Sequence, residues 1–570
     1  MLAELKKISK QNLAITGLTF GVLAFWVFSR VANINPAILQ DEFVYTYSSR
    51  RIGYWDQTPA YDFGNYLFNF IYSSTLLCGD SFYTCGKVLN LFFFSAFVFT
   101  LLLIALRYLP FWWSLGFAVI VYLSPLSVYV SMYLPESLYF FLIASSVLVL
   151  SYALESDSWR HWLIAGALLG AAGLAKPHAL ISLMAIGIFV FIYSLGKRPI
   201  WRPMVIRGFS FLGGYLALRL SLGFALAGPK ALDVFGAYGA SSGVGDLVGS
   251  VATGDLEQTE SLVGAGSVEG ALGLFPIQIV THTNSVLALL GASVAAILLV
   301  VIMVAVKRQA NPAESFVLLT AVWLGVMVVS IVLFTGWVTG SGDDHTTRIL
   351  LRYYDFIFPI VGLASLVAIH RASLLEAKLW QRWLAAALPV TVSGLAFSGF
   401  FGTLTIQIAD APNLAGLVSE RFSFDGVSVL GFAALLMLAF YPQFFKFGLA
   451  AALTFTFSVT GFFAQEQYSL ARGADSPADK AGQYIAANYP LEVREQIAIL
   501  ASSRFDGRVA SLWMDADNEL VLAMPGSNIP TETFIEEPTM VLVLGDFSLE
   551  QETSLVFEGE GFSLRELVND

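Results

Sequence analysis

Acidic and basic residues recur at the ends of apolar segments, where their side chains could do chemistry at a membrane surface. Two adjacent carboxylates, Asp41 and Glu42, follow the first apolar segment, and a third, Glu136, precedes a later one. Charged groups are costly in hydrocarbon, so those at membrane level tend to mark function. Basic side chains that could hold an anion such as a phosphate stand at Lys176, His178, His345, Arg348 and Arg352. A carboxylate among cations is suited to taking a proton beside an anionic leaving group.

The composition predicts a protein whose main solvent is lipid. Of the 570 residues, 56% are hydrophobic and 13% are charged, whereas a typical soluble domain carries about 25% charged residues. A helix needs roughly 20 apolar residues to cross a bilayer, and runs near this length predict about thirteen spans, give or take one or two because short runs could be re-entrant or interfacial. The runs are 12–29, 88–106, 111–130, 137–154, 163–175, 179–195, 204–226, 285–306, 316–338, 353–369, 383–400, 427–441 and 447–463.

The distribution of Lys and Arg predicts the orientation of these spans. Lys6, Lys7 and Lys10 precede the first span, which we interpret as a retained anchor, and cytoplasmic loops are enriched in such residues. Every second loop is then basic, with Arg107; Arg160; Lys197, Arg198 and Arg202; Lys307 and Arg308; Arg371, Lys378 and Arg382; and Lys446. We expect a multi-pass cell-membrane protein, in a bacterial inner membrane, with a cytoplasmic N-terminus and an extracytoplasmic C-terminus. All the candidate residues then lie at the outer face.

Two domains are expected. Residues 1–463 form the membrane domain, with long outer loops at 31–87 and 227–284, and within the first loop 66–77 is predicted to be an interfacial helix. Residues 464–570 contain 19 acidic and 6 basic residues. There, Ser476 and Pro477 begin a predicted helix at 478–488, and strands are predicted at 497–501, 520–524, 540–544 and 554–557. The tail is thus a small extracytoplasmic α/β domain, and no nucleic-acid partner is expected.

The two cysteines, Cys78 and Cys85, share the first outer loop. They could form a disulfide in an oxidising compartment or remain two free thiols, because spacing alone does not fix connectivity.

Three short motifs resemble those of a known superfamily. The segment from Asp41 to Tyr45, Asp-Glu-Phe-Val-Tyr, resembles the acidic first-loop motif of the GT-C membrane glycosyltransferases, which include aminoarabinose transferases, protein O-mannosyltransferases and arabinofuranosyltransferases. Residues 173–178 look like a helix-end segment of these enzymes, and 352–359 is similar to their Arg-Tyr…Pro entry into a later span. The resemblance implies eleven to thirteen spans, interfacial helices in the first outer loop and an extracytoplasmic C-terminal domain.

The resemblance also implies an activity and roles for the candidate residues. The enzyme would be an inverting hexosyl- or pentosyltransferase that moves one sugar from a polyprenyl-phosphate donor in the bilayer to a glycan, lipid or protein acceptor. Asp41 would be the general base, with Glu42, Tyr45 and Glu136 orienting the acceptor or the cations. The donor phosphate would be held by Lys176, His178, His345, Arg348 and Arg352.

Three alternatives stay open at this point. No cofactor is expected, but Asp41, Glu42 and Glu136 could instead hold a divalent metal, because hard cations take carboxylate oxygens. A polyprenyl-lipid flippase or transporter would explain the spans, although it would tend to place ionisable residues near the membrane midplane and between internal repeats, which the sequence does not display. A polymerase or ligase that uses a diphosphate-linked glycan is the closer rival.

Overall fold

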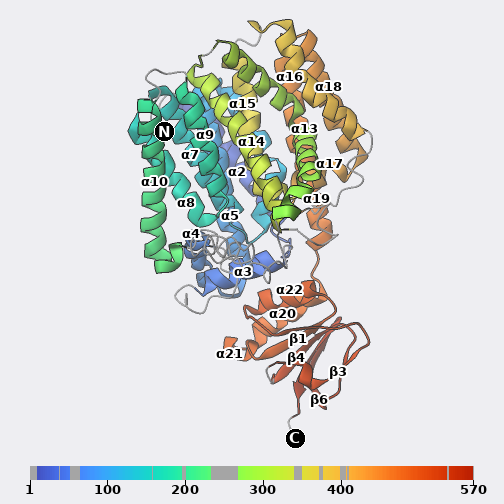
Figure 1. Ribbon diagram of the computed structural model, residues 1–570. Coiled ribbons are helices and arrows are strands. Elements are labelled where there is room, and N and C mark those ends of the chain that lie inside the picture. Colours follow the sequence, from blue (N-terminus) through green and yellow to red (C-terminus); the bar gives the residue numbers. More distant parts are fainter. Residues whose placement is uncertain are drawn as a thin grey trace.

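The computed structural model describes residues 9–36, 39–51, 64–156, 158–195, 201–232, 268–307, 309–338, 349–371, 376–397, 406, 408, 410–535 and 538–568. A large helical bundle is followed by a smaller domain at the C-terminus (Figure 1). The elements of the bundle are α2 (Lys10–Val31), α3 (Leu39–Arg50), α4 (Tyr66–Tyr72), η2 (Ser73–Ser81), α5 (Phe82–Tyr108), α6 (Phe111–Tyr122), η3 (Pro125–Ser131), α7 (Glu136–Ser156), α8 (Trp159–Ala175), α9 (Ala179–Leu195), α10 (Trp201–Ala227), η4 (Gly228–Leu232), α13 (Val268–Lys307), α14 (Pro312–Val338), η7 (Leu351–Tyr353), α15 (Ile357–Arg371), α16 (Leu379–Phe397), α17 (Pro412–Val418), α18 (Arg421–Phe440) and α19 (Phe445–Arg472).

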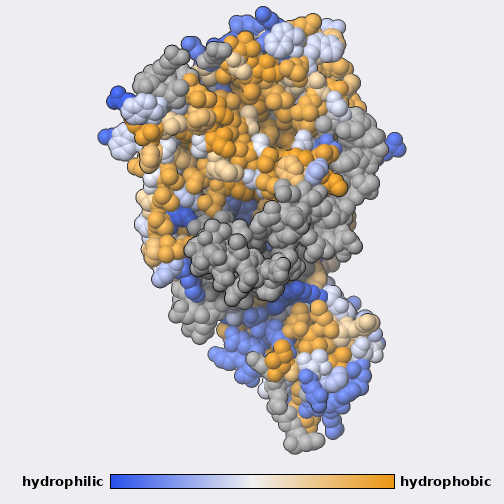
Figure 2. Space-filling view, viewed as in Figure 1, coloured by the Kyte–Doolittle hydropathy of each residue, from blue (hydrophilic) through white to orange (hydrophobic). Residues whose placement is uncertain are grey.

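The predicted class, an α-helical multi-pass membrane protein, is confirmed. Each predicted apolar run overlaps at least one helix. Within the described residues, eight helices are long and apolar enough to cross a membrane, or nine if one bent pair is a single span. The count of thirteen crossings and their orientation therefore stay predictions. On the face shown in Figure 2, hydrophobic residues cover much of the bundle, whereas the C-terminal domain is richer in hydrophilic residues.

The run at 111–130 is not the continuous span that its hydrophobicity predicts. It is divided into α6 and η3, which are bent by 52° relative to each other. Pro125 is the first residue of η3 and has no backbone N–H to continue the ladder of α6, so it begins a new helix instead. This break is followed by the buried Tyr133, whose hydroxyl lies 2.9 Å from that of Thr75 in the predicted outer loop at 31–87.

Close packing of α8 against α10 fixes the position of the end of α8. A Cβ on Gly166 would lie 1.9 Å from the carbonyl oxygen of Phe211, and one on Gly214 would lie 2.0 Å from that of Leu163. Only glycine allows the two backbones to come this close. Near the end of α8, Arg219 of α10 donates a hydrogen bond of 2.9 Å to the carbonyl of Gly173. The residues that follow α8 are thereby held in place.

The C-terminal domain has the expected α/β organisation. Its five-stranded sheet has the order β2-β1-β4-β7-β6, in which β1 pairs in parallel with β2 and β4, and β7 is antiparallel to β4 and β6. The elements are α20 (Pro477–Asn488), α21 (Leu491–Arg494), β1 (Ile497–Ala501), α22 (Arg504–Met514), β2 (Leu520–Leu522), β3 (Asn528–Ile529), η10 (Thr531–Thr533), β4 (Met540–Leu544), β5 (Ser548–Leu549), β6 (Thr553–Gly559) and β7 (Phe562–Leu567). The last bundle helix, α19, continues to Arg472, past the predicted division at 463/464.

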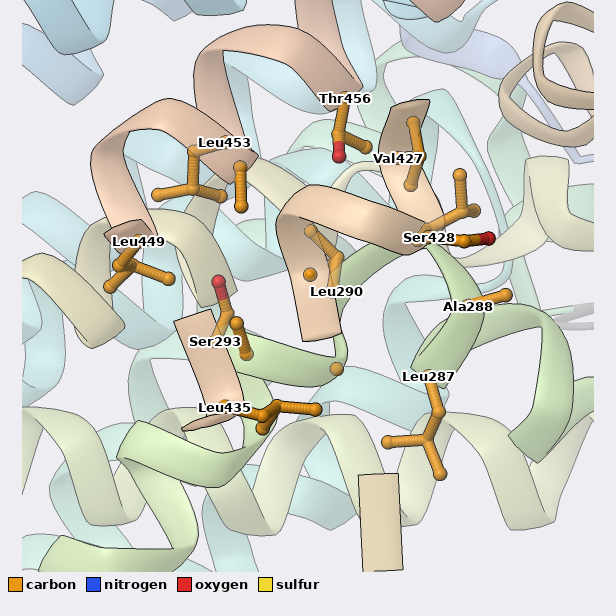
Figure 3. A pocket seen from close by; sticks show the side chains of 15 residues that line it. Leu287, Ala288, Leu290, Ser293, Val427, Ser428, Leu435, Leu449, Leu453 and Thr456 are labelled. Atoms are coloured by element: carbon orange, nitrogen blue, oxygen red, sulfur yellow. The ribbon is translucent and has the colours of Figure 1, made fainter. Parts of the chain in front are cut away.

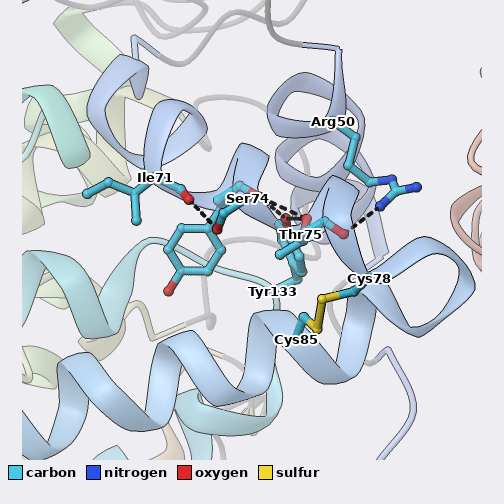
Figure 4. Close-up of a disulfide and its surroundings, with 8 residues drawn as sticks. Arg50, Ile71, Ser74, Thr75, Cys78, Cys85 and Tyr133 are labelled. Atoms are coloured by element: carbon cyan, nitrogen blue, oxygen red, sulfur yellow. Dashed lines mark hydrogen bonds between the residues drawn. A yellow bond between two sulfur atoms is a disulfide. The ribbon is translucent and has the colours of Figure 1, made fainter.

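The segment 31–87, predicted to be the first outer loop, contains α3, two shorter helical segments and a disulfide. The predicted interfacial helix at 66–77 is divided into α4 and η2. Cys78 and Cys85 are bonded, with Cα atoms 6.6 Å apart, so the disulfide was the correct alternative. The bond joins η2 to the first turn of α5, close to Thr75, which shares a 2.9 Å hydrogen bond with Tyr133 (Figure 4).

Candidate active site

The structure brings the predicted residues on α3, α7, α8 and η7 to one end of the bundle. Asp41 stands in the first turn of α3, Glu136 begins α7, Lys176 follows α8 directly, and Arg352 lies in η7. The same end of the bundle faces the C-terminal domain, because α3 packs against α22 (Figure 1). The expectation that distant parts of the sequence converge on one face is therefore met by the described residues.

Arg352 is paired with two carboxylates. Its Nη2 donates a hydrogen bond to Asp41 Oδ2, and its Nε lies 3.8 Å from Asp410 Oδ1. Its backbone N–H also donates to the carbonyl of Asp410, at 2.7 Å. The Arg352 and Asp410 side chains are 9% and 2% exposed, whereas that of Asp41 is 24% exposed. Asp41 is thus the member of this group that a substrate can reach.

Lys176 and Glu136 form a second ion pair, in which Nζ and Oε1 are 2.8 Å apart and both side chains are buried. The other oxygen of Glu136, Oε2, has no hydrogen-bond partner among the described residues. A buried carboxylate oxygen is normally hydrogen-bonded, so this atom is available to a ligand. The predicted role of Glu136, to orient the acceptor or the cations, stays a prediction.

Tyr353 lies between the two ion pairs. The Lys176 Nζ and the Arg352 guanidinium carbon are each 5.3 Å from the centre of its ring. The His178 ring stacks on Tyr353 at 4.4 Å with an interplanar angle of 10°. Burial, together with the Lys176 and Arg352 cations, lowers the pKa of the His178 imidazole well below its usual value. His178 is therefore neutral and could offer a phosphate a hydrogen bond but no charge.

Glu42 and Tyr45 lie on the buried side of α3. Glu42 Oε1 accepts hydrogen bonds from the Tyr83 hydroxyl at 2.6 Å and from the backbone N–H of Tyr133 at 2.8 Å. Glu42 therefore ties α3 to the bundle, whereas the Asp41 carboxylate accepts a hydrogen bond from Arg352. Burial, and after it the charges of Asp41 and Glu136, raises the pKa of the Tyr45 hydroxyl well above its usual value, so this group stays protonated.

The sequence interpretation missed two carboxylates. Asp410 precedes Pro412 and α17, far in sequence from its partner Arg352. Asp355 is buried, and its Oδ2 accepts a 2.7 Å hydrogen bond from the Tyr129 hydroxyl. Asp355 was missed because it falls inside the apolar run 353–369. Its place close to the candidate residue Arg352 in the sequence could have indicated that it lies near the site. His345 and Arg348 lie outside the described residues.

The carboxylates of the described site are divided among separate partners. No group of three or more His, Cys, Asp or Glu residues is placed within the described parts of the chain to hold an ion. Asp41, Glu42 and Glu136 each face a different partner, namely Arg352, Tyr83 and Lys176.

A separate pocket lies among α13, α18 and α19, at the kink of α13 (Figure 3). The kink is at Leu290, whose φ and ψ are −129° and 21°. The lining is mainly apolar, with Ser293, Ser428 and Thr456 as its polar side chains, and it contains no acid or base. This pocket does not belong to the candidate site.

No protein-family model and no curated protein sequence matches the chain. Several solved structures do match it. ArnT from Cupriavidus metallidurans, solved bound to undecaprenyl phosphate, superposes with a TM-score of 0.50 and 16% identity, over 96% of this chain and 97% of that one. The archaeal oligosaccharyltransferase AglB from Archaeoglobus fulgidus, in complex with an inhibitory peptide and a dolichol-phosphate, has a TM-score of 0.48 and 11% identity, over 94% of this chain and 70% of that one. By its likeness to ArnT over nearly the full length of both chains, this protein has the fold of the GT-C superfamily of membrane glycosyltransferases.

Proposed function

We propose that the protein is an inverting glycosyltransferase that moves a single sugar from a polyprenyl-phosphate donor to a glycan, lipid or protein acceptor at the extracytoplasmic face of the membrane. The observation that carries the proposal is the partly exposed Asp41 carboxylate beside the buried Arg352 guanidinium. A base and a phosphate-binding cation stand next to each other, as transfer from a lipid phosphate requires. The undecaprenyl phosphate in the ArnT structure supports this class of donor.

In the proposed reaction Asp41 accepts the proton of an acceptor hydroxyl. The acceptor oxygen forms a bond to the anomeric carbon while the bond from that carbon to the phosphate oxygen breaks. A single displacement inverts the anomeric configuration, and the polyprenyl phosphate leaves with the bonding electrons. A positioned base of this kind contributes about 10²–10⁴-fold to the rate.

In this scheme Arg352 binds the phosphate of the donor. Its planar fork can hold two phosphate oxygens, while Lys176 acts as a point charge nearby. The additional negative charge that develops on the leaving phosphate would be stabilised by these fixed cations. Asp410 remains as a partner for the Arg352 side chain when Asp41 turns to the acceptor.

The described site has fewer cations than carboxylates, so we expect a further cation when a phosphate binds. Arg352 and Lys176 stand against the carboxylates of Asp41, Asp410 and Glu136. A bound phosphate adds further negative charge. Arg348, from the sequence, is our candidate to supply this cation, and a divalent metal is the alternative.

The donor class is tested with purified protein in lipid nanodiscs, given the same sugar on a polyprenyl monophosphate or on a polyprenyl diphosphate. We expect turnover with the monophosphate donor.

Arg352→Lys keeps the charge but loses the planar fork of the guanidinium, so donor KM should rise about tenfold, the equivalent of one charged hydrogen bond. Arg421→Lys, on an exposed helix surface, is the matched control. Turnover with the diphosphate donor alone would favour the polymerase or ligase, and an unchanged donor KM in Arg352→Lys would remove Arg352 from the donor site.

A further inference from the structure

The C-terminal domain and the end of α19 hold the start of the segment that carries Asp41. The Arg472 Nε donates a hydrogen bond of 2.6 Å to the carbonyl of Pro36, and the Asn35 backbone N–H donates to the Arg472 carbonyl at 2.8 Å. The Asn35 side chain also donates to Asp475 Oδ1 at 2.9 Å. These contacts lie just before α3.

The other end of α3 is held by the C-cap residue of α22, Asp515. The Arg50 Nε donates to Asp515 Oδ2 at 2.9 Å, and Arg51 Nη2 donates to the Asp515 carbonyl at 2.8 Å. Arg51 also reaches Glu495 Oε1 at 3.0 Å. Arg50 and Arg51 are basic residues on the face predicted to be outside, where such residues are disfavoured. Their acidic partners in the tail offset these charges.

Between these two ends, α22 contacts the middle of α3 and its support. The Arg508 guanidinium lies 4.9 Å from the centre of the Phe43 ring, next to Glu42 in the sequence. The Trp513 ring packs 5.6 Å from that of Tyr83, whose hydroxyl donates to Glu42. The contacts therefore extend along the whole of α3.

Two features set this interface apart from a simple attachment point. Asp515 has a φ of 55°, and within the described chain no other residue except glycine has a positive φ. Aspartate tolerates this left-handed conformation at a helix end, and here its carboxylate and its carbonyl both bind α3. The second feature is the buried Asp479, which accepts hydrogen bonds from Arg472 at 3.0 and 2.9 Å and from Trp513 at 2.8 Å. It connects the contact before α3 with the contact on α22.

We propose that the C-terminal domain positions α3 for catalysis, and that Asp515 is a positioning residue that acts through Arg50. This inference rests on the proposed transferase function. The domain sets the location of Asp41 relative to Arg352 without touching the substrate. Because a displacement of about 1 Å can cost about 10²-fold in rate, a small shift of α3 would lower kcat.

The test uses Asp515→Asn in the full-length protein. Asparagine keeps the shape and tolerates the left-handed backbone, but it removes the charge that pairs with Arg50. We expect kcat to fall by about 10-fold or more while donor KM changes less than about twofold. Hydrogen exchange of the peptide that covers α3 should become faster. Glu560→Gln, which breaks the exposed ion pair with Lys480 in the same domain, is the matched control. It should change neither kcat nor the hydrogen exchange of α3.

Arg50 supplies the second arm of the test. Arg50→Gln should reproduce the loss, the double variant with Asp515→Asn should be no slower than either single variant, and Arg50→Lys should recover part of the rate. Wild-type kcat and unchanged exchange of α3 in both single variants would overturn the proposal, as would a loss that appears entirely in donor KM. Hydrogen exchange does not depend on turnover. A wild-type protein that transfers no sugar would therefore contradict the proposed function, while the exchange of α3 would still decide whether the domain holds this helix.

Discussion

Adjacent carboxylates on α3 have different environments and therefore different expected roles. Glu42 is fully buried and accepts hydrogen bonds from Tyr83 and Tyr133, whereas Asp41 is partly exposed beside Arg352. A base that takes a proton from a substrate must be reachable, and an anchor must be buried and saturated with donors. Substitution of Asp41 should therefore mainly change the rate of transfer, and substitution of Glu42 should mainly change the stability of the protein.

Asp41→Asn should lower turnover by about 10²-fold or more, because the amide keeps the shape but cannot accept the proton. Steady-state transfer rates measure the loss, and binding of a polyprenyl monophosphate should persist. Near-normal transfer by this variant would show that Asp41 is not the base.

Glu42→Gln should mainly lower stability, by about 1–3 kcal/mol, because two buried donors lose their charged acceptor. Thermal unfolding in detergent measures the effect against the wild type. A Glu42→Gln variant with full stability and no turnover would instead assign the base to Glu42.

At the scale of the elements, the tight contact of α8 with α10 gives a steric prediction. Gly166→Ala should destabilise the protein by about 1–3 kcal/mol, because the new methyl group would overlap the Phe211 carbonyl and force the helices apart. Gly187→Ala is the control, since no atom lies within 4 Å of a Cβ at that position on α9. Equal thermal unfolding of the two variants would contradict the packing described here.

Much of the element pattern was predictable from the sequence, because long apolar runs have few alternative structures in a bilayer. The strands β1 and β4 were also predicted with their exact bounds, as short buried apolar runs. The strand β7 was missed because Arg565 and Glu566 interrupt its hydrophobic pattern. The bend between α6 and η3 was missed because Pro125 sits in an otherwise continuous apolar run.

The convergence of the charged residues was predictable, but their pairing was not. Sequence order and loop charge placed Asp41, Glu136, Lys176 and Arg352 at the same end. The pairing of Arg352 with Asp41 and of Lys176 with Glu136 depends on how α3, η7, α7 and α8 pack, which no local pattern encodes. Asp410 was not predicted for the same reason, because its contact with Arg352 also depends on tertiary packing.

At the scale of the whole molecule, the alternation of basic loops predicts the sides of the two domains. A reporter fused after residue 570 should be extracytoplasmic, and one inserted near residue 308 should be cytoplasmic. Paired reporters that respond to opposite compartments measure both positions. If both land on the same side, the odd number of spans is wrong, and so is the assignment of the site to the outer face.

The disulfide between Cys78 and Cys85 has a consequence for biogenesis. Such bonds form and persist in oxidising compartments, and seldom in the bacterial cytosol. The bond joins η2 to α5, and η2 contributes Thr75, whose carbonyl accepts a hydrogen bond from Arg50 of α3. With the predicted orientation, we expect the surroundings of α3 to reach their final form only after this loop has been translocated and oxidised. A chain retained on the reducing side would lack this bond beside α3, and we expect it to lack the proposed transferase activity until the bond forms.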